Sequence, residues 1–315
     1  MKKNLQLIRN GFIGCVLLAC GMLIPKKADA QAIITVGNGN ASNTTSLIPV
    51  NSLYNYTYSQ QVYLASEIGV SGNITKLRFY FNAGTMLEND DWTVYLGYKT
   101  TNTFSGSTNW VPIGSLTQVF SGILPTPSSS GFTLEIPLTT PFYYDMSLGN
   151  LVVAIDENSS GYEYESTMFG VTPGTGRSIY YRSDVTNPDP SSPPSGTVYG
   201  YFPDIQFEIH STTPCAAPIT AGTITGAASV CPGVSTTISA SGYTFAQGLS
   251  YQWQSSTNGF TWNDIAGATT PNLTTVNPVP TSYRFRVICP AGPDTVYSNI
   301  LNMGVNPFMS CYCPN

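Results

Sequence analysis

The sequence is short of charged side chains, and it contains a single histidine. Only 9% of its 315 residues are Asp, Glu, Lys or Arg, and His210 is the one histidine. Ser-His-Asp and Cys-His catalysis both need a histidine base, so only His210 could supply one. His210 falls on the polar face of an expected strand beside a linker, which favours a solvated side chain. We therefore predict that the chain is not an enzyme.

Basic residues are scarce after the first 30 positions. Residues 31–315 hold 7 Lys and Arg against 16 Asp and Glu, a net charge of −9. Binding to phosphate backbones needs a basic surface, so nucleic acid is excluded as a partner. The sequence also lacks a phosphate-binding loop and a cofactor fingerprint, so we predict no organic cofactor.

Long apolar runs are missing, apart from residues 11–24. This run is shorter than the roughly 18 to 20 residues of a membrane span. Basic residues precede it and Ala28-Asp29-Ala30 follows it, the order of a secretory signal cleaved before Gln31. A lipidated Cys20 is the alternative. We predict a signal peptide over residues 1–30 and a secreted or cell-surface protein whose mature chain has no transmembrane segment.

Sustained helical periodicity is absent too, and strand-like alternation takes its place. Four segments of residues 31–210 alternate apolar and polar side chains with a period of two, as expected for strands with one buried face. Leu151 to Ile155 is a continuous apolar run, typical of a strand buried on both faces. We predict an all-β chain with a jelly-roll-like β-sandwich over residues 31–210. The alternating apolar sets are Leu77, Phe79 and Phe81; Trp92, Val94 and Leu96; Phe132, Leu134 and Ile136; and Ile205, Phe207 and Ile209.

A second alternating stretch predicts a second domain. Leu249, Tyr251 and Trp253 alternate with polar residues, and Asn258-Gly259 supplies a tight hairpin after which Phe260 and Trp262 resume the pattern. We predict a linker over residues 211–217, an immunoglobulin-like β-sandwich over 218–305, and a tail over 306–315 that opens a truncated further module.

Five cysteines remain in the mature chain, all in its last third: Cys215, Cys231, Cys289, Cys311 and Cys313. Disulfides are their expected form in an oxidising compartment. Zinc is disfavoured because Cys311 and Cys313 are separated by one residue, whereas zinc-binding pairs have two to four between them. A cysteine on each side of a strand tryptophan is the immunoglobulin-like pattern, so we predict a Cys231–Cys289 disulfide packed against Trp253. The partners of the other three cysteines stay open.

Two groups of residues are candidate binding sites. Tyr180, Tyr181, Tyr199 and Tyr201, in or near a proline-rich loop, could form an aromatic platform for a sugar. Asp90, Asp91, Asp156 and Glu157 could bind calcium through loop oxygens. Paired carboxylates for glycoside hydrolysis, drawn from the same acids with Glu88, Glu163 and Glu165, are a further alternative, although solvated acidic loops are commoner.

Several motifs resemble those of a known group of bacterial proteins. Residues 251–289, with Tyr-Gln-Trp-Gln-Ser-Ser, Trp262 and Tyr283-Arg284, resemble the immunoglobulin-like modules of surface adhesins and gliding-associated proteins of bacteria with type IX secretion. Trp92 to Gly97, Leu151 to Asn158 and Ser178 to Tyr181 are similar to the leading domain of secreted proteins of that group.

This resemblance implies a non-catalytic, secreted or cell-surface protein that takes part in adhesion or ligand binding. An ancillary carbohydrate-binding region of a larger secreted hydrolase is the alternative. The partner is then an extracellular protein or glycan.

Overall fold

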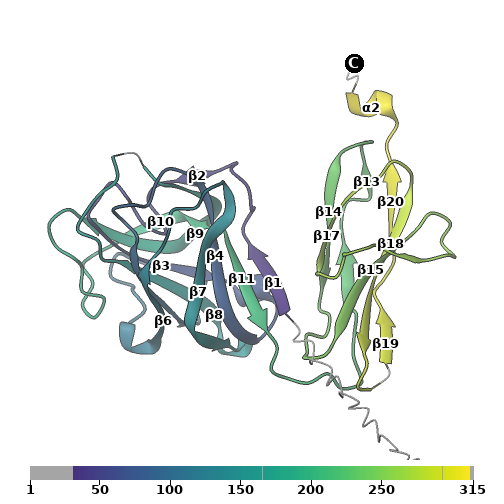
Figure 1. Ribbon diagram of the computed structural model, residues 1–315, viewed down its shortest axis with the longest axis horizontal. Coiled ribbons are helices and arrows are strands. Elements are labelled where there is room, and N and C mark those ends of the chain that lie inside the picture. The colour runs from purple at the N-terminus through teal and green to yellow at the C-terminus, as the bar shows by residue number, and fades with distance from the viewer. Residues whose placement is uncertain (1–30, 165, 293, 313–315) are drawn as a thin grey trace, which may run out of the picture.

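The computed structural model describes residues 31–164, 166–292 and 294–312. This part of the chain is all-β, and its curled sheets form β-sandwiches, which confirms the predicted fold class. Figure 1 shows two β bodies side by side, β1 to β11 in the first and β12 to β20 in the second. No described helix is long and apolar enough to cross a membrane. The predicted signal peptide, Cys20 and Cys313 lie outside the described residues.

One continuous sheet makes both layers of the first body, in the order β1-β11-β4-β9-β3-β8-β5-β6, with β10 and β2 paired to β9 and β7 paired to β4. Because β9 pairs with β4 near its start and with β3 further on, it joins the two layers. The strands are β1 (Gln31–Val36), β2 (Thr44–Thr45), β3 (Tyr56–Tyr63), β4 (Gly72–Ala83), β5 (Asp91–Lys99), β6 (Leu116–Ile123), β7 (Gly131–Tyr144), β8 (Asn150–Glu157), β9 (Met168–Ser183), β10 (Thr197–Pro203) and β11 (Ile205–His210), with a short helix α1 (Ala65–Ile68).

The predicted core of the first body is largely confirmed by burial. Phe79, Trp92 and Phe207 are fully buried in one apolar cluster between the layers. Strand β8 is buried along its whole length, as the apolar run predicted. Its Val153 contributes to this cluster, while Val152 packs on the other face in a second, smaller cluster.

The second body is a sandwich of two sheets, one ordered β12-β14-β17 and one ordered β13-β20-β18-β15-β16, with β19 paired to β18. Its strands are β12 (Thr223–Thr225), β13 (Ser229–Val230), β14 (Ser235–Ser241), β15 (Ser250–Ser256), β16 (Asn263–Asp264), β17 (Asn272–Val276), β18 (Thr281–Cys289), β19 (Asp294–Tyr297) and β20 (Leu301–Val305), followed by α2 (Phe308–Tyr312). The Phe245 side chain packs against the cores of both bodies.

The predicted buried face of β15 is confirmed, but the prediction that strand alternation resumes at Phe260 directly after the hairpin turn is wrong. Tyr251 and Trp253 are buried, and Gly259 has the positive φ of 75° that the turn requires. Phe260, however, is 90% exposed. The return strand β16 begins only at Asn263, because side-chain hydrogen bonds of Asn258 to the backbone hold the intervening residues in a wider loop.

The predicted Cys231–Cys289 disulfide is wrong. The structure pairs Cys215 with Cys289 and Cys231 with Cys311. Cys231 directly follows β13, which joins β20 at Val305, the end of the sheet where β18 begins. Cys289 is the last residue of β18, eight residues after its start, so a strand places the two ends roughly 26 Å apart. A disulfide spans at most about 7 Å between Cα atoms, so Cys231 and Cys289 cannot pair.

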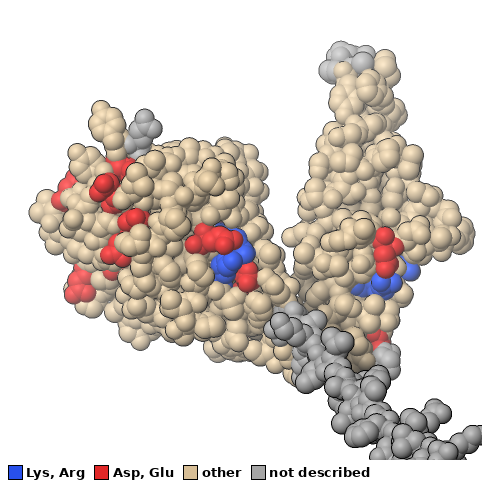
Figure 2. Space-filling view, viewed as in Figure 1, with Lys and Arg blue, Asp and Glu red and all other residues tan. Residues whose placement is uncertain are grey.

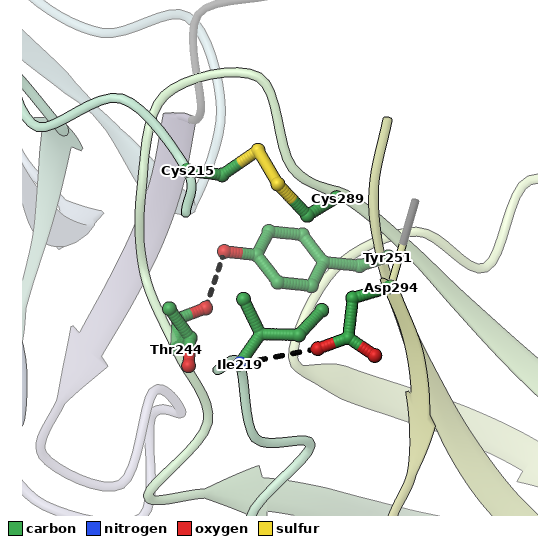
Figure 3. The surroundings of a disulfide bond; sticks show 6 residues. All are labelled: Cys215, Ile219, Thr244, Tyr251, Cys289 and Asp294. Atoms are coloured by element: carbon green, nitrogen blue, oxygen red, sulfur yellow. Dashed lines mark hydrogen bonds between the residues drawn. A yellow bond between two sulfur atoms is a disulfide. The ribbon is translucent and has the colours of Figure 1, made fainter. Parts of the chain in front are cut away.

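The Cys215–Cys289 disulfide packs near a tyrosine instead of the predicted tryptophan. In Figure 3 the ring of Tyr251 lies next to the disulfide, and its hydroxyl donates to the Thr244 carbonyl at 3.0 Å. Trp253 lies further along β15, opposite Phe285, and packs on that ring. The two disulfides therefore close opposite ends of the second body.

We predict that this pairing is measurable in the native protein. A non-reducing peptide map should join residues 215 with 289 and 231 with 311. Replacing both Cys215 and Cys289 by serine should lower the free energy of unfolding by about 4 kcal/mol, because the bond restricts an unfolded loop of 74 residues. A mapped peptide joining residues 231 and 289 would contradict this arrangement.

Candidate functional site

Three of the four predicted tyrosines form one cluster on strands β9 and β10. The ring centroids of Tyr180 and Tyr199 are 6.0 Å apart with an edge-on contact, and those of Tyr199 and Tyr201 are 5.5 Å apart. Tyr180 is 7% exposed and packs with Ile48, while the other two rings are partly exposed. We call Tyr180, Tyr199 and Tyr201 the tyrosine cluster.

Tyr181 does not belong to the tyrosine cluster. Successive side chains of a strand point to opposite faces, so Tyr181 lies on the other face of β9 from Tyr180. On that face it is paired across the ladder with Tyr58. The prediction that all four tyrosines form one platform is therefore wrong in this one residue.

The predicted calcium ligands do not converge. Asp156 and Glu157 are neighbours on β8, so their carboxylates point to opposite faces of the sheet, and both are buried. Among the described residues, no group of three or more His, Cys, Asp or Glu side chains is arranged to hold a metal ion. The grouping of Asp90, Asp91, Asp156 and Glu157 as one calcium site is therefore wrong.

The Glu157 carboxyl is fully buried, and its hydrogen-bond donors among the described residues are neutral. It accepts hydrogen bonds from the Ser159 backbone N–H at 2.7 Å and from the Asn89 side chain at 3.3 Å. Burial raises the pKa of Glu157 to about 8. Burial, assisted by the charges of Asp189 and Asp91, also raises the pKa of Asp156 to about 7. Both acids are therefore substantially protonated in the folded protein near neutral pH.

The remaining acids and the histidine have local partners. Glu163 accepts from the Thr85 hydroxyl at 2.6 Å and from the Glu88 backbone N–H at 2.8 Å, so it holds the turn before β5. His210 is partly exposed, with its Nε2 3.5 Å from Glu208, which in turn pairs with Arg78 at 2.7 Å. Glu165 lies outside the described residues.

Sequence reasoning missed a cluster on the outer face of the second body. The guanidinium carbon of Arg284 lies 4.3 Å from the ring centroid of Trp262 and 4.0 Å from that of Tyr297. Arg286 pairs with Asp264 at 2.8 Å. Figure 2 shows the basic atoms of the second body gathered in one place, beside acidic atoms. The alternation of β18 places both arginines on one face, but the hairpin conformation that brings Trp262 over Arg284 has no sequence signal.

Comparisons with known proteins match one family model to the second body only. Residues 220–307 match a family model described as a domain of unknown function, DUF8696. No characterised protein matches at a significant level. Among solved structures, a β-1,2-glucanase from Parabacteroides distasonis is similar at 11% identity and a TM-score of 0.24, covering 76% of this chain and 28% of the glucanase. The FN1–FN3 domains of chicken CNTN1 are similar at 8% identity and a TM-score of 0.21, covering 74% of this chain and 65% of that one.

The two raised pKa values predict a first body that is more stable in mild acid. The folded pKa of each acid exceeds its unfolded value near 4, so the folded state binds more protons between these values and stability falls as pH rises. Each group lowers the free energy of unfolding by about 1.4 kcal/mol per pH unit. This fall ends when the pH passes about 7 for Asp156 and about 8 for Glu157.

Urea unfolding between pH 5.5 and 8.5 measures this dependence. Glu157→Gln should flatten the slope, whereas the matched change Glu88→Gln, at an exposed acid, should leave it unaltered. A variant with Glu157→Gln whose stability depends on pH as steeply as that of the wild type would show that Glu157 is ionised in the folded protein.

Proposed function

We propose that the chain is a secreted, non-catalytic protein that displays its two β-sandwich bodies as binding modules at the cell exterior, in adhesion or ligand binding. The observation that carries this proposal is the tyrosine cluster. The partly exposed ring of Tyr199 packs edge-on against the buried ring of Tyr180, and the partly exposed ring of Tyr201 packs against Tyr199. Rings fixed in this way offer a large contact area at a low cost in conformational entropy, as the aromatic anchors of binding interfaces do.

The two disulfides support the extracellular part of this proposal. Disulfides persist in oxidising compartments and are rare in the cytosol. Here they close both ends of the second body, through Cys215–Cys289 and Cys231–Cys311. A module closed in this way suits a surface protein because local opening of its ends is restricted.

An ancillary carbohydrate-binding region of a larger secreted hydrolase is the second candidate. The tyrosine cluster also favours this function, because partly exposed aromatic rings bind the apolar faces of sugars. The rings of Tyr199 and Tyr201 are tilted by 39° to each other, so they would contact a sugar from two directions.

Binding assays separate the two candidates. In both a glycan array and an attachment assay to cells and matrix proteins, Tyr199→Ala with Tyr201→Ala should reduce binding at least about tenfold, as the loss of two aromatic anchors implies. The matched control is Tyr164→Ala, at a ring that is 95% exposed and outside the cluster.

Cluster-dependent attachment without sugar binding favours adhesion, whereas cluster-dependent glycan binding favours the carbohydrate-binding role. Unchanged binding in both assays would remove the tyrosine cluster as the binding surface. Hydrolytic turnover that survives His210→Ala and is lost on replacement of one carboxylate would refute the non-catalytic assignment.

A further inference from the structure

Arg284 presents an unused hydrogen-bonding edge on the outer face of β18. Its guanidinium lies between the rings of Trp262 and Tyr297, and its Nε donates to the Gln254 side-chain oxygen at 2.7 Å. Within the described residues, its two terminal nitrogens have no hydrogen-bond acceptor. The guanidinium of Arg284 is therefore held in place, while its two terminal nitrogens stay free to donate.

A guanidinium fixed in this way matches a carboxylate. Its terminal N–H groups form a planar fork that donates two parallel hydrogen bonds to the two oxygens of one carboxylate. The rings and Gln254 hold the plane of Arg284 before a ligand arrives, so binding costs less side-chain entropy than it would for a free surface arginine. Arg286 is not equivalent, because it is already paired with Asp264.

The surroundings of Arg284 are polar and uncharged on the side away from Arg286. A shallow depression of about 430 Å³ includes Asn258, Ser282 and Asn302 in its lining. Ser282 lies two residues before Arg284 on the same face of β18, roughly 7 Å away. Ser282 donates to the Asn302 side-chain oxygen at 2.7 Å, and the Asn258 side-chain oxygen accepts from two backbone N–H groups of its own loop. The groups left to bind the hydroxyls of a ligand whose carboxylate occupies Arg284 are the Ser282 lone pairs and the side-chain N–H groups of Asn258 and Asn302.

The charges of the second body indicate a ligand with few charges. Between residues 218 and 305 the only charged residues are Asp264, Arg284, Arg286 and Asp294. The Asp264 carboxylate interacts electrostatically with Arg284 but hydrogen-bonds to Gln254 and Arg286. The free terminal donors of Arg284, beside neutral hydrogen-bonding groups, therefore fit a molecule with one carboxylate per unit and several hydroxyls.

We propose that Arg284 and the adjoining depression bind an acidic sugar, a uronic acid unit, with its carboxylate on Arg284 and its hydroxyls on Asn258, Ser282 and Asn302. The partly exposed ring of Tyr297, at 46% exposure, borders this site and contacts the apolar face of the sugar. This inference rests on the proposed role in extracellular binding and names a ligand class for a second surface.

Calorimetric titration of the full chain with tri-galacturonic acid tests the proposal. The Arg284→Lys variant keeps the charge but loses the planar fork, so binding should weaken roughly 10- to 100-fold, the worth of a charge-assisted hydrogen bond. The matched control is Arg182→Lys, at an arginine of the first body whose guanidinium carbon lies 4.4 Å from the Tyr54 ring centroid. This control should bind as the wild type does.

Two further titrants make the test independent of whether the variant folds. The methyl ester of the same trisaccharide lacks the carboxylate charge and should bind wild-type protein at least about tenfold more weakly. A short poly-glutamate peptide should not bind. Equal affinity for acid and ester, or binding of the peptide in place of the sugar, would overturn the proposal. Failure here with binding retained in the glycan or attachment assays would leave the proposed function standing.

Discussion

The first body depends on strand β9, because this strand hydrogen-bonds to both layers of the sandwich. Phe169, near its start, pairs with β4, and Arg182, near its end, pairs with β3. Strand β9 therefore holds together the two layers between which Phe79 and Trp92 are buried. The same strand pairs with β10 and carries Tyr180 beside Tyr199, so one strand both joins the layers and positions the tyrosine cluster.

Buried carboxyl groups, together with buried amides such as Gln60 and Gln61, depart from an apolar interior. Glu157 and Asp156 occupy the end of β8, and burial favours the protonated form of each, as the direction of their pKa shifts indicates. Asn89 contributes by donating to Glu157 and to the Tyr54 carbonyl, which links β8 to two loops at one end of the body. These acids thus have a structural role that a solvated acidic loop would not have.

The proposed binding surfaces share a physical principle, although they lie on different bodies. In each, side chains that contact solvent are held in place by neighbours: Tyr199 by the buried Tyr180, and Arg284 by Trp262 and Tyr297. Holding such groups before a ligand arrives lowers the entropic cost of binding. Broad strand faces provide this support because adjacent strands place side chains about 5 Å apart.

The sequence by itself determined the all-β class and the buried faces of individual strands, because a period of two assigns alternate side chains to opposite sides. Leu151 to Ile155, Tyr251 and Trp253 were predictable for this reason. Only the tertiary structure decided which cysteines pair, that β10 brings Tyr199 against Tyr180, and that Trp262 covers Arg284. These relations join residues that are far apart in the chain or flank an irregular loop, and strand order and loop conformation, not local alternation, set the distances between them.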